Sequence, residues 1–265
     1  MTQKKWLIGV VAILMASLLG IGCSTGNSGS DDDDMGGGDD ISALVGTWKS
    51  TYEHQGILST DFEETTFTVS EDGSFSRLSV TTTVYEDTGE EEYYSYACKG
   101  KLKLSGDRVT LSTTSEYEGD ETLEALPTSG WVPVSYSESM PIYEHDGKMY
   151  NAVYTRQGSG TGLVGTWTTL VTYKEPYEGM TLVNESTNTL TFTDDTITEY
   201  SRDFVYPAGY RDEGEIEDEE SDTYPYSSLT AEQLTIDGTV TWRYIIDGNV
   251  LLILREGETA YEKQP

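Results

Sequence analysis

The stretch Leu44-Val45-Gly46-Thr47-Trp48 recurs residue for residue as Leu163-Val164-Gly165-Thr166-Trp167. The offset from Leu44 to Leu163 is 119 residues. A spacing of this length corresponds to a whole small domain and far exceeds the period of a solenoid repeat. The sequence therefore predicts the same folding unit twice, over residues 41–157 and 163–265, joined by the linker Gly-Ser-Gly-Thr-Gly at 158–162.

Alternation of apolar and polar residues with a period of two is the dominant pattern in both units, and it is typical of β-strands. In the second unit, such a run from Val240 to Ile246 is followed by Asp247-Gly248, and the alternation resumes from Val250 to Leu254. An Asp-Gly pair between two alternating runs is a strong signal for a β-hairpin. We predict an all-β chain with seven or eight strands per unit. A small antiparallel up-and-down barrel is favoured over a sandwich, because closure removes exposed strand edges.

The Gly-x-Trp stretches Gly46-Thr47-Trp48 and Gly165-Thr166-Trp167 resemble the signature at the first strand of lipocalins. In that family an arginine near the end of the barrel packs across the tryptophan and joins the first and last strands. The resemblance implies that Arg156 covers Trp48 and that Arg255 covers Trp167. It also implies two tandem lipocalin-like barrels, similar to the small tandem domains of bacterial lipoproteins.

The N-terminal segment is typical of an exported protein. Lys4 and Lys5 precede an apolar run, Trp6 to Ile21, that fits a secretory signal peptide and is short for a membrane span. The run ends at Gly20-Ile21-Gly22-Cys23-Ser24, which resembles the bacterial lipobox, whose cysteine is acylated. We therefore expect a signal peptide over residues 1–22, a lipid on Cys23 and a location in the cell envelope, at the outer membrane. The alternatives are an ordinary cleaved signal and an uncleaved anchor.

The residues that follow Cys23, up to residue 40, are mainly Gly, Ser, Asn and Asp and have no apolar periodicity. Such a composition buries too little surface to fold, so we expect a flexible acidic tether. The whole chain is acidic, with 47 Asp and Glu against 16 Lys and Arg. Phosphate repulsion makes nucleic acid an implausible partner. The acidic runs, such as 212–222, could supply calcium ligands, but their spacing does not fit an EF-hand and we interpret them as solvated loops.

No catalytic or metal-binding motif is evident. The two histidines, His54 and His145, lie outside any recognisable hydrolase or metalloprotease pattern, so we expect no catalytic residue and no cofactor. If Cys23 is acylated, Cys98 has no disulfide partner, and its place in an alternating run predicts a buried, inert thiol.

Strand parity selects a set of candidate interior side chains that could line a cavity: Phe67, Leu78, Val80, Tyr94 and Tyr96. A barrel of about eight strands either fills its interior or leaves room for one small ligand. We expect a non-enzymatic protein that binds a small apolar or amphipathic molecule. Two alternatives stay open, namely a structural or interaction protein with filled barrels, and a carbohydrate-active enzyme that uses a pair of carboxylates.

Overall fold

The computed structural model describes residues 40–56, 58–230 and 232–265. The expected signal peptide, Cys23 and the tether up to residue 39 lie outside the described residues. The described chain is all-β, as the alternation predicts, and its helical content is the short 3-10 helix η1 (Arg211–Glu213). Over these residues, no helix is long and apolar enough to cross a membrane.

The first repeat contributes the strands β1 (Gly46–Gln55), β2 (Ser59–Val69), β3 (Ser74–Tyr85), β4 (Glu91–Ser105), β5 (Arg108–Gly119), β6 (Val132–Pro141), β7 (Tyr143–His145), β8 (Lys148–Tyr150) and β9 (Val153–Gln157). The second repeat contributes β10 (Gly165–Tyr177), β11 (Met180–Phe192), β12 (Thr196–Pro207), β13 (Glu215–Thr230), β14 (Gln233–Ile236), β15 (Val240–Asp247), β16 (Val250–Leu254) and β17 (Tyr261–Lys263). All the pairings between them are antiparallel.

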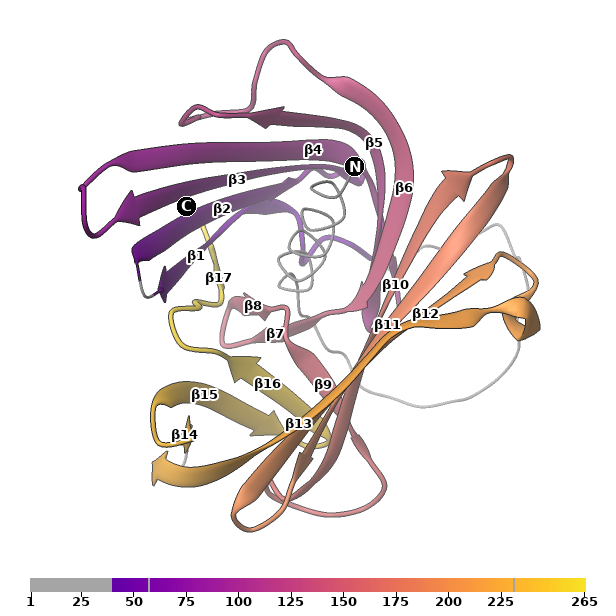
Figure 1. Ribbon diagram of the computed structural model, residues 1–265. Coiled ribbons are helices and arrows are strands. Elements are labelled where there is room, and N and C mark those ends of the chain that lie inside the picture. The colour runs from indigo at the N-terminus through magenta and orange to yellow at the C-terminus, as the bar shows by residue number, and fades with distance from the viewer. Residues whose placement is uncertain (1–39, 57, 231) are drawn as a thin grey trace.

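Eight of these strands form a closed antiparallel barrel. Each strand from β10 to β16 pairs with the next, β16 pairs with β9, and β9 pairs back with β10. In Figure 1 this ring occupies the bottom of the molecule, and its long strands β10, β11 and β12 extend from there toward the upper right. The barrel interior contains Trp167, Leu190, Phe192, Leu234, Trp242 and Leu251. Closure therefore removes the sheet edges of the second unit and surrounds a packed apolar core.

The first unit contains the remaining strands. Its ladder runs β8–β17–β1–β2–β3–β4–β5–β6. After the single residue Ile142, the chain of β6 continues as β7, which pairs with β8. The C-terminal half of β10 also pairs with β6. The two units are consequently parts of one hydrogen-bonded sheet (Figure 1), and their relative position is held by backbone pairing.

The last strand of each repeat lies in the other unit. β9 belongs to the first repeat by sequence, but it closes the barrel of the second. β17 belongs to the second repeat, but it lies between β1 and β8 of the first unit. The repeat boundaries at residues 157 and 163 describe the sequence, whereas strand pairing crosses them in both directions.

The repeated stretch has the same structural role in both units. The indole Nε1 of Trp48 donates to the carbonyl oxygen of Leu44 at 2.9 Å, and that of Trp167 donates to Leu163 at 2.8 Å. Both tryptophans are buried, and a Cβ on Gly46 or Gly165 would overlap the cationic side chain that covers the ring. The sequence repeat is thus also a structural repeat. In both units a loop carbonyl accepts the hydrogen bond of the buried indole, and the glycine leaves space for the cationic side chain that lies over the ring.

Candidate functional site

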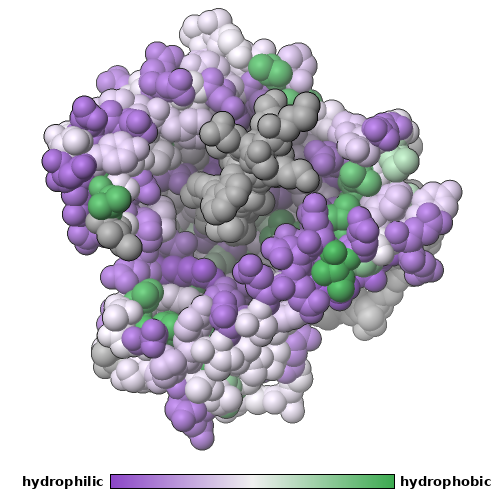
Figure 2. Space-filling view, viewed as in Figure 1, coloured by the Kyte–Doolittle hydropathy of each residue, from purple (hydrophilic) through white to green (hydrophobic). Residues whose placement is uncertain are grey.

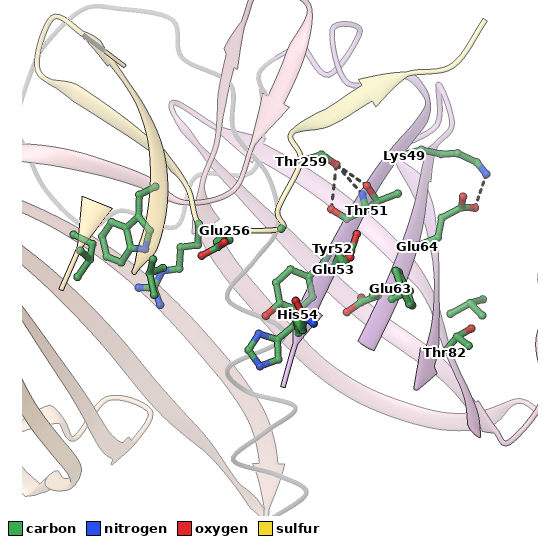
Figure 3. Close-up of a pocket in the computed structure, with 18 of the residues that line it drawn as sticks. Lys49, Thr51, Tyr52, Glu53, His54, Glu63, Glu64, Thr82, Glu256 and Thr259 are labelled. Atoms are coloured by element: carbon green, nitrogen blue, oxygen red, sulfur yellow. Dashed lines mark hydrogen bonds and ion pairs between the residues drawn. The ribbon is translucent and has the colours of Figure 1, made fainter. Parts of the chain in front are cut away.

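A wide, open hollow lies between the two units and has a volume of about 1560 Å³. Its walls come from β1, β2, β3 and the loop 122–124 on one side, and from β12 to β15 on the other. The segment 255–260, which carries the chain from β16 to β17, runs along it. We call this hollow the chamber and this segment the strap. Figure 3 shows Tyr52, His54 and Glu63 from the first unit and Glu256 from the strap around this space.

The first unit opens into the chamber at the end of β1. Tyr52 and His54 are on the same face of β1 as the plug residue Trp48, because side chains two apart share a face. Glu63 pairs with Tyr52 across the β1–β2 ladder and shares that face. The rings of Tyr52 and His54 are stacked, with centroids 6.2 Å apart and an interplanar angle of 4°. Both faces of these strands therefore reach the chamber, because Phe62 and Val80 line it from the opposite face.

The barrel of the second unit opens into the same chamber. Ile236 and Trp242 belong to the barrel core and also line the chamber. The guanidinium of Arg255 lies 5.0 Å from the Trp242 ring and pairs with Glu199 at 2.5 Å. Burial opposes the charge of Arg255, but Tyr154 and Glu199 beside it outweigh this effect, so the pKa of Arg255 is raised. A charged pair thus lies beside the Trp242 indole where the barrel core meets the chamber.

The chamber carries an excess of negative charge. Its acidic lining residues are Glu53, Glu63, Glu64, Glu124, Glu199, Asp237 and Glu256, and its fixed cations are Lys49 and Arg255. Lys49 pairs with Glu64 at 2.6 Å, and Arg255 pairs with Glu199, so both cations are already neutralised. The remaining carboxylates repel anions, and they favour a neutral or positively charged group. Among the described residues, no group of three His, Cys, Asp or Glu is arranged to hold a metal ion.

Apolar side chains form the other part of the chamber wall. They are Phe62, Val80, Leu123, Ile236, Val240 and Trp242. Phe62 is 43% exposed and Val240 is 40% exposed, although both are large hydrophobic residues. Elsewhere the face of the molecule shown in Figure 2 is mainly hydrophilic, with small separate apolar spots. The chamber wall therefore combines apolar side chains with carboxylates.

The interior of the first unit contains a polar layer around a small cavity. A small cavity of about 10 Å³ is lined by Phe75, Arg77, Tyr96, Cys98, Leu111, Thr113, Tyr136 and Glu138. A space of this size holds about one water molecule and excludes a lipid. Arg77 and Glu138 are both buried, and the hydroxyls of Tyr96 and Tyr136 share a hydrogen bond of 2.7 Å. Of these two hollows, the chamber is the one with room for a small organic molecule.

Burial shifts the titration of two groups in this polar layer. It raises the pKa of Glu138 to about 7, although Arg77 acts in the opposite direction. It raises the pKa of the Cys98 thiol to about 11, again against the effect of Arg77. A neutral thiol in a closed interior is a poor nucleophile.

The five residues expected to line a cavity are divided between two faces. Phe67 and Tyr96 lie in the apolar core of the first unit, and Tyr94 packs against it. Leu78 and Val80 lie on the opposite face of β3, so their expected interior position was wrong. The ladder pairs Phe67 with Arg77 and Thr65 with Ser79, and these residues occupy the interior. Leu78 is buried beside Ala97 on the other face, and Val80 lines the chamber.

The cation that covers each tryptophan also differs from expectation. Arg156 pairs with Trp167, not Trp48, and its guanidinium lies 4.0 Å from the Trp167 ring. Lys263 pairs with Trp48, and its Nζ lies 5.3 Å from that ring. Arg255 covers Trp242 instead of Trp167. The covering cations differ from expectation because the last strand of each repeat lies in the other unit.

The sequence contains a pattern that indicates the role of Lys263 as a covering cation. Tyr154-Thr155-Arg156-Gln157 and Tyr261-Glu262-Lys263-Gln264 share their first and last residues and carry a cation at the third position. These are the last strands of the two repeats, and Tyr154 and Tyr261 are both buried. Arg255 does not belong to this pattern, and it lies over Trp242 instead of a plug tryptophan.

His54 lies in the chamber, and His145 lies in the first unit at the end of β7. The Nδ1 of His145 is 3.7 Å from the carboxylate of Asp247, and its Nε2 is 3.6 Å from that of Asp146. The two histidines are therefore on separate surfaces. No protein family, curated protein or solved structure matches this chain.

Proposed function

We propose that this chain is a lipid-anchored protein of the bacterial cell envelope, at the outer membrane, that binds a small amphipathic molecule in the chamber without transforming it. The lipid anchor is supported by the signal-like run before Cys23 and by the Gly-Cys-Ser stretch that resembles a lipobox. A tether of Gly, Ser and Asp residues would hold the folded part away from the membrane surface.

We also propose that both units are lipocalin-like barrels, each plugged by its Gly-x-Trp stretch. The first unit meets this description if β6 and β7 are taken as one strand bent at Ile142, because its ladder then returns to β8. An arginine covers the plug tryptophan Trp167, as in the family that the chain resembles, and a lysine takes this place over Trp48. The exchanged last strands are a departure from a simple tandem arrangement.

The observation that carries the binding proposal is that side chains of both units line one chamber, which combines apolar side chains with carboxylates that have no ion-pair partner among the described residues. Burying apolar surface contributes about 25 cal/mol per Å², so about 200 Å² of ligand surface against the apolar part of the wall contributes about 5 kcal/mol before ordering costs. The carboxylates then determine which charge the head group of the ligand can carry. An amphiphile with a neutral or positive head group is expected to bind, and one with an anionic head group is not.

Calorimetric titration with three probes of equal chain length tests this proposal. Dodecyltrimethylammonium and dodecanol are expected to bind below their aggregation concentrations, and dodecanoate is expected not to bind. Trp242→Ala is expected to weaken binding at least tenfold, whereas Tyr177→Ala, an exposed residue at the tip between β10 and β11, is the matched control with unchanged binding. Absence of binding for all three probes, or equal binding of the anion, would contradict the proposal.

A structural or interaction role is the second candidate. It is favoured by Tyr177 and Met180, two large apolar side chains that are about half exposed at the tip between β10 and β11. Crosslinking from this tip in intact cells would recover a defined envelope protein in this case, and the calorimetric titrations would be blank.

A further inference from the structure

The position of β17 defines a strand-binding slot in the first unit. β17 lies between β1 and β8, where Trp48 pairs with Lys263 and Met149 pairs with Tyr261. Tyr261 is only 2% exposed and belongs to the core of the first unit. Without β17, this core would lose one wall, and the edges of β1 and β8 would be open to another strand.

The occupant of the slot is recognised by its side chains. Tyr261 enters the core, Lys263 lies over the Trp48 ring, and Glu262 pairs with Lys148 at 2.6 Å. The equivalent slot between β10 and β16 holds β9, whose Tyr154 and Arg156 have the same two roles. Both slots therefore accept a strand with the pattern Tyr-x-cation-Gln, and each strand comes from the other repeat.

The only covalent connection of β17 to the second unit is the strap. Four of its first five residues are exposed: Arg255, Glu256, Gly257 and Thr259. The strap follows β1 through hydrogen bonds from the Glu53 amide to the Gly257 carbonyl and from the Thr259 amide to the Thr51 carbonyl. None of the contacts within the slot requires that β17 and the slot belong to the same chain.

We propose that the slot is an interaction site for the C-terminal strand of a second copy of this chain. Two copies that exchange β17 would form every contact of the slot twice, so the closed dimer and the monomer differ mainly in the path of the strap. Exchange of an identical element between protomers is a low-cost route to a dimer, and the length of the connecting segment sets the balance. The inference depends on strand pairing and does not depend on the ligand proposed for the chamber.

Deleting Glu256 and Gly257 from the full-length chain tests the proposal. The deletion preserves strand parity and shortens the strap from six residues to four, which disfavours the path of β17 to its own slot. Native mass spectrometry is therefore expected to show a species of twice the monomer mass. A chain with two glycines inserted after Glu256 is the matched control and should stay monomeric. Adding Tyr261→Ala and Lys263→Ala to the deletion should abolish the dimer.

A folded, monomeric deletion variant would overturn the proposal. If the deletion variant does not fold, unmodified full-length chains decide the question. Isotope-labelled and unlabelled copies are mixed in mild denaturant at high concentration and then diluted into buffer. Mixed dimers that dissociate in the Tyr261→Ala, Lys263→Ala background support the site, and the absence of mixed dimers overturns it.

Discussion

Replacing Glu138 with glutamine is expected to change how the stability of the protein depends on pH. Glu138 is buried in the first unit, and burial raises its pKa from an ordinary 4.5 to about 7. The folded protein therefore binds a proton more tightly than the unfolded chain does at this position. The neutral carboxyl makes its full contribution to the free energy of unfolding below pH 4.5. This contribution is lost as the pH rises from 4.5 through 7, and the free energy of unfolding no longer depends on Glu138 ionisation at higher pH.

The size of the effect follows from the shift. One pKa unit corresponds to 1.36 kcal/mol, so a rise from 4.5 to about 7 corresponds to about 3 kcal/mol between acid and neutral pH. Glutamine has the shape of the neutral carboxyl and does not ionise. The free energy of unfolding of the Glu138→Gln variant is therefore expected to be higher than that of the parent protein by up to about 3 kcal/mol at pH 8. Near pH 4.5 the two values are expected to be equal.

Urea unfolding followed by tryptophan fluorescence at several pH values between 4.5 and 8 measures this difference. The pKa values of Glu116 and Glu258 are also raised, mainly by burial, but both residues remain in the variant, so the difference curve isolates Glu138. Glu124→Gln, at an exposed position, is the matched control. Parallel stability curves for the parent and Glu138→Gln would refute the proposed burial of a titrating carboxyl.

Three further predictions concern the buried residues Trp167 and Cys98 and the closely packed Gly257. Trp167→Ala removes a fully buried indole and its cover by Arg156, so it is expected to lower the free energy of unfolding by about 3–5 kcal/mol; a loss under about 1 kcal/mol in urea unfolding would contradict this. Gly257→Ala would place a Cβ 1.7 Å from the carbonyl oxygen of Glu53 at a φ of +83°, so faster hydrogen exchange in β17 is expected, with Gly248→Ala, in an open turn, as the control. Cys98, a buried thiol with a raised pKa, is expected to react with a maleimide only as fast as the protein unfolds, and labelling of the folded protein within minutes would refute this.

The fold class was predictable because its signals are local. Period-two alternation and Asp-Gly turns indicate strands and hairpins without reference to distant residues, and the hairpins around Gly147 and Gly248 occur in the structure. The plug tryptophans were predictable for the same reason, since Leu44 and Trp48 are four residues apart. These features depend on short-range geometry.

The chamber and the exchanged strands were not predictable in this way. Whether Arg77 or Leu78 faces the interior of β3 depends on register, and a shift of one residue reverses every side chain. The order Arg-Leu-Ser-Val in β3 fits either assignment, because the interior of the first unit contains a polar layer. Pairing of Trp48 with Lys263 joins residues at opposite ends of the folded chain, and the tandem repeat favours the wrong partner.

The place of β17 has a consequence for synthesis of the protein. The first unit acquires its last strand from the final residues of the chain, so the N-terminal half cannot complete its core until translation has reached the last codons. Folding that starts at the N-terminus during synthesis would pause with one wall of that unit missing. A premature stop codon near residue 260 would accordingly damage the part of the protein that was made first.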